Sequence, residues 1–190
     1  MATVIVANDL VGVGKVALTS SLPIMSACQT EVLPLPTVLL SSHTGEFENI
    51  YMRDLTDDLK GFYKQWEHLD FTVDGLVSGY FKSREELKIV GQLARDKRIA
   101  LFVDPIMGDN GRLYQGFDME YVEAMKDFCQ QADAIIPNLT EASLLTDSPY
   151  LEVGSYDKAT VDKLLRDLTK LGPRKVVLTG ISFEEGKIGL

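Results

Sequence analysis

Short apolar runs alternate with amphipathic patterns along most of the chain, and this alternation is the feature that most limits how the sequence can fold. The first run, Thr3–Ala7, is rich in β-branched residues and is typical of a buried strand. Further strands are expected at 74–80, 99–103, 134–136 and 175–179. Apolar strands separated by helices form parallel sheets that are covered on both faces. We therefore expect an α/β three-layer sandwich with a mainly parallel central sheet, in a single domain over residues 1–190.

The segments between the expected strands carry the periodicity of helices that bury one face. Helices are expected at 54–68, 83–93, 118–131, 139–146 and 161–171. Two further segments contain proline. A helix over 15–29 is expected to kink or break at Pro23. A strand over 32–40 is expected to be interrupted, or to lie at a sheet edge, because it contains Pro34 and Pro36.

The composition excludes several classes of protein. The formal net charge is −9 and Lys and Arg do not cluster, so we expect binding neither to nucleic acid nor to an anionic membrane. No apolar run approaches the roughly 20 residues that a membrane-spanning helix needs. Cys28 and Cys129 match no metal or redox spacing, and both are expected to be reduced core residues. Because the N-terminus shows no secretory leader, we expect a cytoplasmic protein.

Polar side chains and glycines follow the expected strands. In an open parallel sheet, ligands bind beyond the carboxyl ends of the strands. The segments at these positions are Asn8-Asp9, Ser41–Gly45, Asp104–Gly111, Pro137–Glu141 and Thr179-Gly180. We therefore expect five strand ends to converge on one edge that carries acids, amides, hydroxyls and glycines.

The oxygen donors in these segments suit a magnesium ion. Asp104 and Glu141, together with Asn138, supply oxygen atoms, whereas the sequence offers no Cys/His metal cage. Magnesium is commonly held by one or two carboxylates together with waters and phosphates. Each residue also has a purely structural interpretation, with Asp104-Pro105 as a turn and Asn138 as the N-cap of a helix. For any single residue both interpretations stay open.

Two nucleotide-binding motifs are only partly matched near the N-terminus. Gly14-Lys15 is similar to the end of a P-loop, but Asp9 replaces the first glycine and Val16 replaces the Ser or Thr. The P-loop is therefore excluded. The segment Gly12–Ala17 matches the loose dinucleotide fingerprint, yet the next strand does not end in the acid that holds a ribose. An NAD-type site is therefore disfavoured.

The order and spacing of the motifs provide a more specific signal. The segments concerned are Leu35–Thr37 with Ser41–Gly45, Asp104–Tyr114, Pro137–Ala142 and Val176–Gly180. They resemble the motifs of the pyridoxal/pyridoxamine (vitamin B6) kinases of the ribokinase-like superfamily, in the form found in Gram-positive bacteria. The resemblance implies ATP-dependent phosphorylation of the 5′-hydroxymethyl group of pyridoxal, pyridoxine or pyridoxamine. It also implies Mg²⁺ as a cofactor, a B6 vitamer as the small-molecule partner, and a homodimer.

The same resemblance implies roles for individual residues. On the substrate side it places Asp9, His43, Thr44, Tyr80 and Tyr114. On the nucleotide side it places Asn138, Thr179 and Gly180, and it assigns Asp104 and Glu141 to Mg²⁺. By its position alone, His43 is equally typical of a loop histidine that bonds to the backbone.

The sequence departs from the family pattern at three points. Asp9 stands where the family usually has Ser, and Ala17-Leu18 where it has Gly-Asn. The family's Gly-Thr-Gly-Asp motif, which implies an anion hole and the aspartate that takes the hydroxyl proton, does not occur in residues 1–190. We therefore expect a C-terminally incomplete kinase whose catalytic aspartate would lie beyond Leu190. The alternatives are a hydroxymethylpyrimidine kinase of thiamine synthesis, and a non-catalytic fragment that binds a ligand or a partner subunit.

Overall fold

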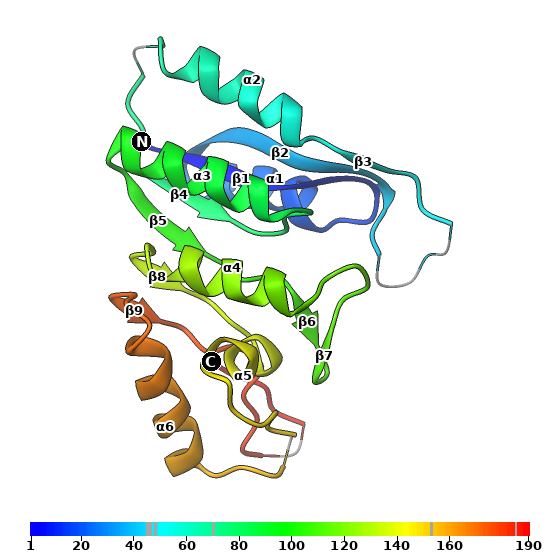
Figure 1. Cartoon of the computed structure of the whole chain (residues 1–190), viewed down its shortest axis with the longest axis vertical. Coiled ribbons are helices and arrows are strands. Elements are labelled where there is room, and N and C mark those ends of the chain that lie inside the picture. The colour runs from blue at the N-terminus through cyan, green and yellow to red at the C-terminus, as the bar shows by residue number, and fades with distance from the viewer. Residues whose placement is uncertain (45–46, 48, 70, 153, 185) are drawn as a thin grey trace. The chain divides into compact units, whose positions relative to one another are not determined.

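The computed structural model consists of two compact units, Met1–Leu101 and Phe102–Leu190 (Figure 1). It describes residues 1–44, 47, 49–69, 71–152, 154–184 and 186–190. Gly45, the last residue of the predicted segment Ser41–Gly45, lies outside the described residues. Among the helices described, none is both long enough and apolar enough to cross a lipid bilayer.

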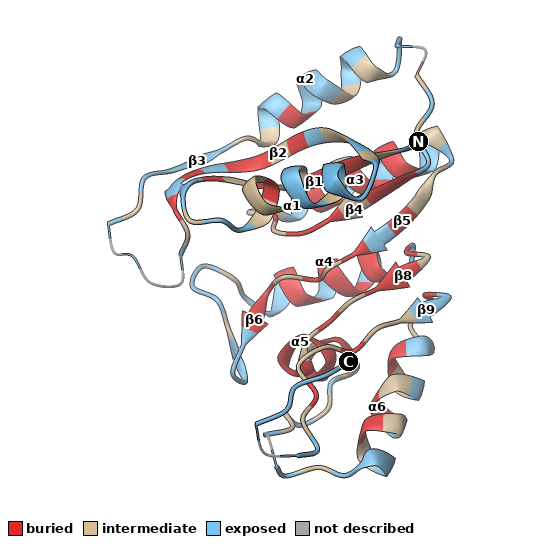
Figure 2. Cartoon of the chain, turned by 180° about the vertical axis from the view of Figure 1, so that it is seen from behind, coloured by how far each residue is buried: buried red, intermediate tan, exposed pale blue. Residues whose placement is uncertain are grey.

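The first unit is built on a mainly parallel sheet with the strand order β3-β2-β1-β4. Its strands are β1 (Ala2–Val13), β2 (Thr30–Ser42), β3 (Met52–Asp54) and β4 (Gly75–Ser78). β1 pairs in parallel with β2 and with β4, whereas β3 runs antiparallel to β2. Its helices are α1 (Ala17–Ala27), α2 (Thr56–Trp66) and α3 (Arg84–Lys97). Figure 1 shows α3 in front of this sheet. Figure 2, which is the view from the opposite side, shows α1 in front of it, so helices cover both faces.

The second unit repeats the parallel pattern. The strand β5 (Ala100–Val103), which begins in the first unit, is followed by β8 (Ala134–Ile135) and β9 (Lys175–Val176). They lie in the order β5-β8-β9 and all pair in parallel. The strands β6 (Gly108–Asp109) and β7 (Arg112–Leu113) form a separate antiparallel hairpin. The helices are α4 (Met119–Cys129), α5 (Leu139–Thr146) and α6 (Lys158–Thr169).

Apolar periodicity predicts the buried faces of these elements well. Ile5, Val6 and Ala7 of β1 are almost fully buried, as the Thr3–Ala7 run predicts (Figure 2). Cys129 of α4 is likewise a core residue, whereas the same expectation for Cys28 is wrong, because Cys28 is exposed at the end of α1. The expected α/β architecture is thus confirmed within each unit.

The prolines interrupt neither of the elements that contain them. α1 continues through Pro23, so of the kink or break expected there, the break does not occur. β2 is one continuous strand that includes Pro34 and Pro36. The expectation of an edge is right, because β3 pairs only with Val38–Leu40, and among the described residues no other strand lies on that side of β2. A proline is tolerated in a strand where its nitrogen faces an unpaired edge.

β1 is longer than its apolar run predicts. It extends to Val13, so Asn8 and Asp9 lie inside the strand, and the expectation that they follow its end is wrong. The pairing register with β2 shifts between Asn8 and Leu10. Such an irregularity redirects side chains locally. It allows two polar residues to occupy the middle of a buried strand.

Candidate active site

Three neighbouring strands of the second unit lead into the predicted polar residues. Asp104 directly follows β5, and Asn138 and Thr179 come shortly after β8 and β9. The backbone pairing continues past the strands, since the Thr179 N–H donates to the carbonyl oxygen of Pro137 at 2.9 Å. Because the three strands are parallel neighbours, their carboxyl ends meet at one edge of the sheet. The structure therefore brings these residues together as predicted.

The carboxyl group of Asp104 is the least satisfied group at this edge. No hydrogen bond or ion pair to it occurs in the part of the chain that the structure describes. Burial raises the pKa of this carboxyl to about 6. A desolvated carboxylate without a partner attracts a cation, because pairing offsets the cost of its burial.

Glu141 lies close to Asp104 but is held by the backbone. Its Oε2 accepts from the Asn138 N–H at 2.9 Å and its Oε1 from the Met107 N–H at 3.2 Å. Burial, followed by the charge of Asp104, raises the pKa of Glu141 to about 8, although these N–H donors act in the opposite direction. The two acids therefore repel each other in a poorly solvated place, which a divalent cation relieves.

The acid pair forms only part of a metal shell. Within the described ranges, no three His, Cys, Asp or Glu side chains gather as a metal site. Asp104 and Glu141 fit an ion such as Mg²⁺, which takes one or two carboxylates and completes its shell with water and phosphate oxygens. The donor set thus fits the predicted cofactor, provided that a phosphate ligand supplies the remaining oxygens.

Tyr114 belongs to the same electrostatic environment. It follows β7, and its N–H donates to the carbonyl oxygen of Met107 at 3.0 Å. Burial, followed by the charges of Asp109, Glu141 and Asp104, raises the pKa of the Tyr114 hydroxyl. Since the side chain is 41% exposed, its ring borders the acid pair and also remains accessible to a ligand.

Asn138 is engaged at both ends of its amide. Its Oδ1 accepts from the Glu141 N–H at 2.9 Å, which completes a capping box at the start of α5. Its Nδ2 donates to the carbonyl oxygen of Gly108 at 2.9 Å. The interpretation of Asn138 as an N-cap is therefore confirmed, and its contact with a nucleotide stays a prediction.

Thr179 and Gly180 form a turn with open space beside it. The Thr179 hydroxyl donates to the carbonyl oxygen of Pro137 at 3.3 Å. Gly180 has φ +75, and nothing lies within 4 Å of the position that a Cβ would occupy. This left-handed backbone favours glycine and leaves the chain accessible to a phosphate group.

In the first unit, the structure brings Asp9 and Tyr80 together. Asp9 is only 8% exposed, and burial raises its pKa to about 6. Burial, followed by the charges of Asp9 and Glu86, raises the pKa of Tyr80 to about 12. Tyr80 also packs against the apolar cluster of Val11, Val38 and Leu40. An acid thus lies beside a tyrosine ring that is fixed by its apolar neighbours.

Asn8 is a site residue that the sequence analysis did not single out. Its Oδ1 accepts from the Asp9 N–H at 3.0 Å and from the Tyr80 N–H at 2.8 Å, so one side chain fixes both backbones. The Thr37 hydroxyl donates to the carbonyl oxygen of Tyr80 at 2.7 Å. The only signal in the sequence is an amide next to an acid directly after the apolar run.

His43 and Thr44 lie at the end of β2. The His43 N–H donates to the carbonyl oxygen of Val13 at 3.2 Å, and its ring meets that of Phe47 edge-on, with centroids 5.0 Å apart. Thr44 is exposed. Their roles as substrate contacts therefore stay predictions.

The close packing of Asn8 against Gly79 provides a test of the first unit. A Cβ at Gly79 would lie 2.4 Å from Asn8 Nδ2. We expect Gly79→Ala to displace Asn8, break its two backbone hydrogen bonds and lower the free energy of unfolding by about 2 kcal/mol. Gly61→Ala is the matched control, because nothing lies within 4 Å of a Cβ there and alanine favours the helix α2. Urea unfolding followed by the fluorescence of Trp66 measures both; equal stabilities would contradict the role of Asn8.

The fold and the strand-end site together define the class of the protein. A parallel α/β fold with acids and hydroxyls at adjacent strand ends is that of the ribokinase-like proteins. Residues 53–188 match the model of the family described as phosphomethylpyrimidine kinase, and the chain belongs to this family.

Three relatives illustrate what the chain is similar to. It is 32% identical over 162 residues to a Saccharomyces cerevisiae protein named "Putative pyridoxal kinase BUD17", covering 80% of this chain and 49% of that protein. The crystal structure of pyridoxal kinase from Lactobacillus plantarum matches with a TM-score of 0.91 and 36% identity, over 100% of this chain and 67% of that one. Pyridoxal kinase from Leishmania donovani in complex with ADP and pyridoxine matches with a TM-score of 0.85 and 25% identity, over 98% and 65%.

The lengths of these proteins differ from that of the chain. The chain spans about half the length of the curated relatives that it matches, and about two thirds of the solved structures. The family and the fold are thus established for these 190 residues.

Proposed function

We propose that the chain transfers the γ-phosphoryl group of ATP to the 5′-hydroxymethyl group of a vitamin B6 vitamer. The observation that carries the proposal is the unpartnered Asp104 carboxyl beside Glu141, at the ends of adjacent parallel strands. The relatives support this proposal, since the two solved structures described are named pyridoxal kinases, the yeast protein is named a putative one, and one of the two structures contains ADP and pyridoxine. Phosphoryl transfer depends chiefly on positioning and on neutralising charge.

The residues of the second unit suit the nucleotide side of such a reaction. Asp104 offers a free carboxylate to Mg²⁺, whereas Glu141, already bonded to two N–H groups, suits the ion's water ligands. When bound, Mg²⁺ neutralises phosphate charge and orients the phosphates. Thr179 offers a hydroxyl and Gly180 an accessible backbone to those phosphates. Asn138 is the third residue proposed to contact the nucleotide. A chain with a net charge of −9 needs such an ion to hold ATP.

The residues of the first unit suit a flat, polar ring. Tyr80 provides an aromatic wall, and the neighbouring Asp9 carboxylate accepts a hydrogen bond from a protonated ring nitrogen. His43 and Thr44 complete the proposed set of substrate contacts of this unit. On the second unit, Tyr114 is the residue proposed to contact the substrate. Asp9 replaces the family's usual serine, so this recognition uses a charge in place of a hydroxyl.

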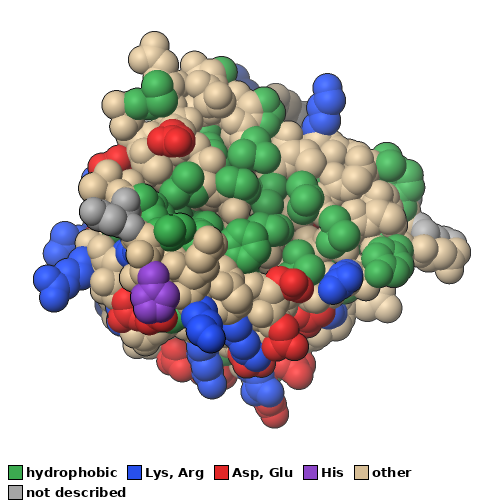
Figure 3. Space-filling view, turned by 90° about the horizontal axis from the view of Figure 1, so that it is seen from above, with side chains coloured by type: hydrophobic (Ala, Val, Ile, Leu, Met, Phe, Trp, Pro, Cys, Tyr) green, Lys and Arg blue, Asp and Glu red, His purple; other side chains and the backbone are tan. Residues whose placement is uncertain are grey.

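The same proposal includes three further points: residues 1–190 form a single domain, the protein is a homodimer, and it is cytoplasmic. Apolar side chains gather on one face of the first unit (Figure 3). Among the exposed apolar residues are Leu39 of β2 and Tyr51 and Met52 at β3. Exposed apolar patches commonly mark contact surfaces between proteins.

A hydroxymethylpyrimidine kinase is the second candidate. The description of the matching family favours it, because that family is named for phosphomethylpyrimidine. Both acceptors are small aromatic rings with a hydroxymethyl group that receives the phosphoryl group of ATP. The residues proposed to bind the nucleotide therefore serve either reaction.

The test measures formation of the 5′-phosphate with Mg²⁺ and ATP, using pyridoxal and hydroxymethylpyrimidine as acceptors. It is made on the 190-residue chain and on a form lengthened to match the relatives. We expect a higher kcat/KM for pyridoxal in whichever form turns over. A higher value for the pyrimidine would favour the second candidate. Binding of pyridoxal without turnover in either form would support a non-catalytic role.

A further inference from the structure

Thr140, in the first turn of α5, contacts the β6–β7 hairpin in addition to Asn138 and Glu141. The hydroxyl of Thr140 accepts a hydrogen bond from the Gly111 N–H at 2.9 Å. Three polar positions of one helix turn therefore hold one hairpin. Asn138 and Glu141 contact its first strand or the residue before it, whereas Thr140 contacts the tip.

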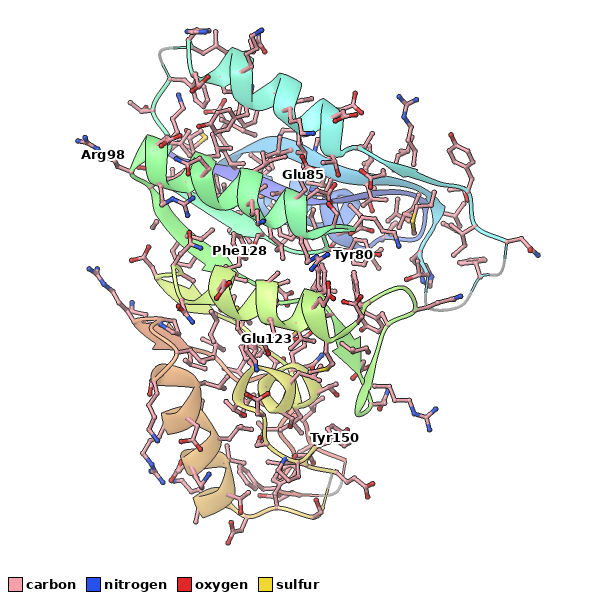
Figure 4. All side chains as sticks on the ribbon, in the orientation of Figure 1. Tyr80, Glu85, Arg98, Glu123, Phe128 and Tyr150 are labelled. Atoms are coloured by element: carbon pink, nitrogen blue, oxygen red, sulfur yellow. The ribbon has the colours of Figure 1, made fainter. Side chains whose placement is uncertain are left out.

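The contact at the tip is close and well defined. Thr140 is only 3% exposed, so its hydroxyl is shielded from water that would replace this bond. Gly111 has φ +75, and a Cβ there would lie 2.9 Å from Cδ1 of Tyr150. Tyr150, labelled in Figure 4, comes from the segment after α5. The tip therefore rests on an aromatic ring and has Thr140 as a buried polar anchor.

Thr140 differs from its two neighbours in what a ligand would do to it. Asn138 and Glu141 face nucleotide and Mg²⁺ in the proposed function, so their hold on the hairpin changes when ligands bind. Thr140 has no such role. Its bond to Gly111 therefore has no competing ligand in the proposed function.

The hairpin sets the position of Tyr114. β7 leads directly to this residue, whose hydroxyl lies in the field of Asp104 and Glu141. A shift of the hairpin therefore moves Tyr114 relative to the acid pair. Displacements of about 1 Å in such a constellation commonly lower rates substantially.

We infer that Thr140 is a positioning residue for the phosphoryl-transfer site, because through Gly111 it fixes the hairpin that presents Tyr114 to Asp104 and Glu141. The consequence for the rate rests on the proposed function. The anchoring of the hairpin does not.

The test compares Thr140→Val, which removes the hydroxyl at nearly constant shape, with Thr140→Ser, which keeps it. Thr146→Val is the matched control, because it removes a hydroxyl of the same helix that bonds to the carbonyl oxygen of Ala142 and to the Ser148 hydroxyl, neither of which belongs to the hairpin. Hydrogen–deuterium exchange of the amides of Gly111 and Tyr114 is measured without ligands. The kcat of each variant is measured in the form that turns over, per folded molecule.

We expect Thr140→Val to speed exchange at Gly111 about tenfold, as loss of one hydrogen bond predicts, with a smaller increase at Tyr114. The kcat should fall by about tenfold, and Thr140→Ser should restore both, while Thr146→Val leaves both unchanged. Unchanged exchange at Gly111 would overturn the anchoring. Faster exchange with an unchanged kcat would show a merely structural role and overturn the positioning.

Failure of the proposed function is recognised separately. If the unsubstituted protein shows no turnover in any form, the proposed function fails and the inference is judged on exchange at Tyr114 alone. Faster exchange there in Thr140→Val, restored by Thr140→Ser, supports the positioning of Tyr114, and no change overturns it.

Discussion

Replacing Asp104 by asparagine is expected to lower kcat/KM for phosphoryl transfer about 1000-fold and to leave the protein as stable as before, or more stable. The loss follows from removal of the only carboxyl at the strand ends of the described chain that is free to take a cation, an effect of the size seen for other electrostatic stabilisers of a transition state. The equal or higher stability follows from burial, because burial penalises the ionised Asp104 carboxyl in the folded state and asparagine carries no charge. Activity assays at saturating Mg²⁺ and thermal unfolding measure the two effects.

The control for Asp104→Asn is Asp127→Asn, which neutralises an exposed acid on α4 of the same unit. Both variants change the net charge by one, so a general effect of charge would move them together. We expect Asp127→Asn to retain the activity of the unsubstituted protein. Asp104→Asn with activity within tenfold of the unsubstituted protein would refute the assignment of the metal site.

The second large effect is a loss of stability as the pH rises in the absence of metal. Burial raises the pKa of Glu141 from 4.5 to about 8, so between these values the folded state holds a proton that the unfolded state has released. The free energy of unfolding must therefore fall as the pH rises through this window. We expect Glu141 alone to contribute a decrease of about 4 kcal/mol between pH 4.5 and pH 8.5.

Other buried acids act in the same direction. The pKa of Asp104 is raised to about 6, and in the first unit those of Asp9 and Glu86 are raised to about 6 and about 7. Urea unfolding in EDTA, followed by circular dichroism across this pH range, gives the total slope. Glu141→Gln, which cannot ionise, should flatten the slope, whereas Asp127→Asn should not. A free energy of unfolding that rises from pH 5 to pH 8 would contradict the burial of these acids.

The strand-end site of the second unit could be predicted from the sequence because its causes are local. Short apolar strands mark where the chain reaches the sheet edge, and Asp104, Asn138 and Thr179 come directly or shortly after them. The N-cap at Asn138 was predictable for the same reason, since it involves residues three positions apart.

The features that escaped prediction depend on pairing between distant segments. Asn8 and Asp9 look like the end of a strand, and only the pairing of β1 with β2 and β4 keeps the chain extended through them. Asn8 reaches Tyr80 across 72 positions, and Thr140 reaches Gly111 across 29. No local pattern encodes such contacts. The same holds for β2, where apolar periodicity does not reveal which side of the strand lacks a neighbour.

Pro34 and Pro36 have a protective consequence beyond the fold of β2. An exposed strand edge offers its N–H and carbonyl groups to any extended chain that approaches, and long apolar edges of this kind seed aggregation. The two prolines lie where β2 has no partner on the side away from β1 in the described residues. Residues 34 and 36 point their nitrogens to the same side of the strand, and neither carries an N–H group. An incoming strand therefore lacks two neighbouring hydrogen-bond donors there. The two prolines thus keep β2 from pairing with strands of other molecules.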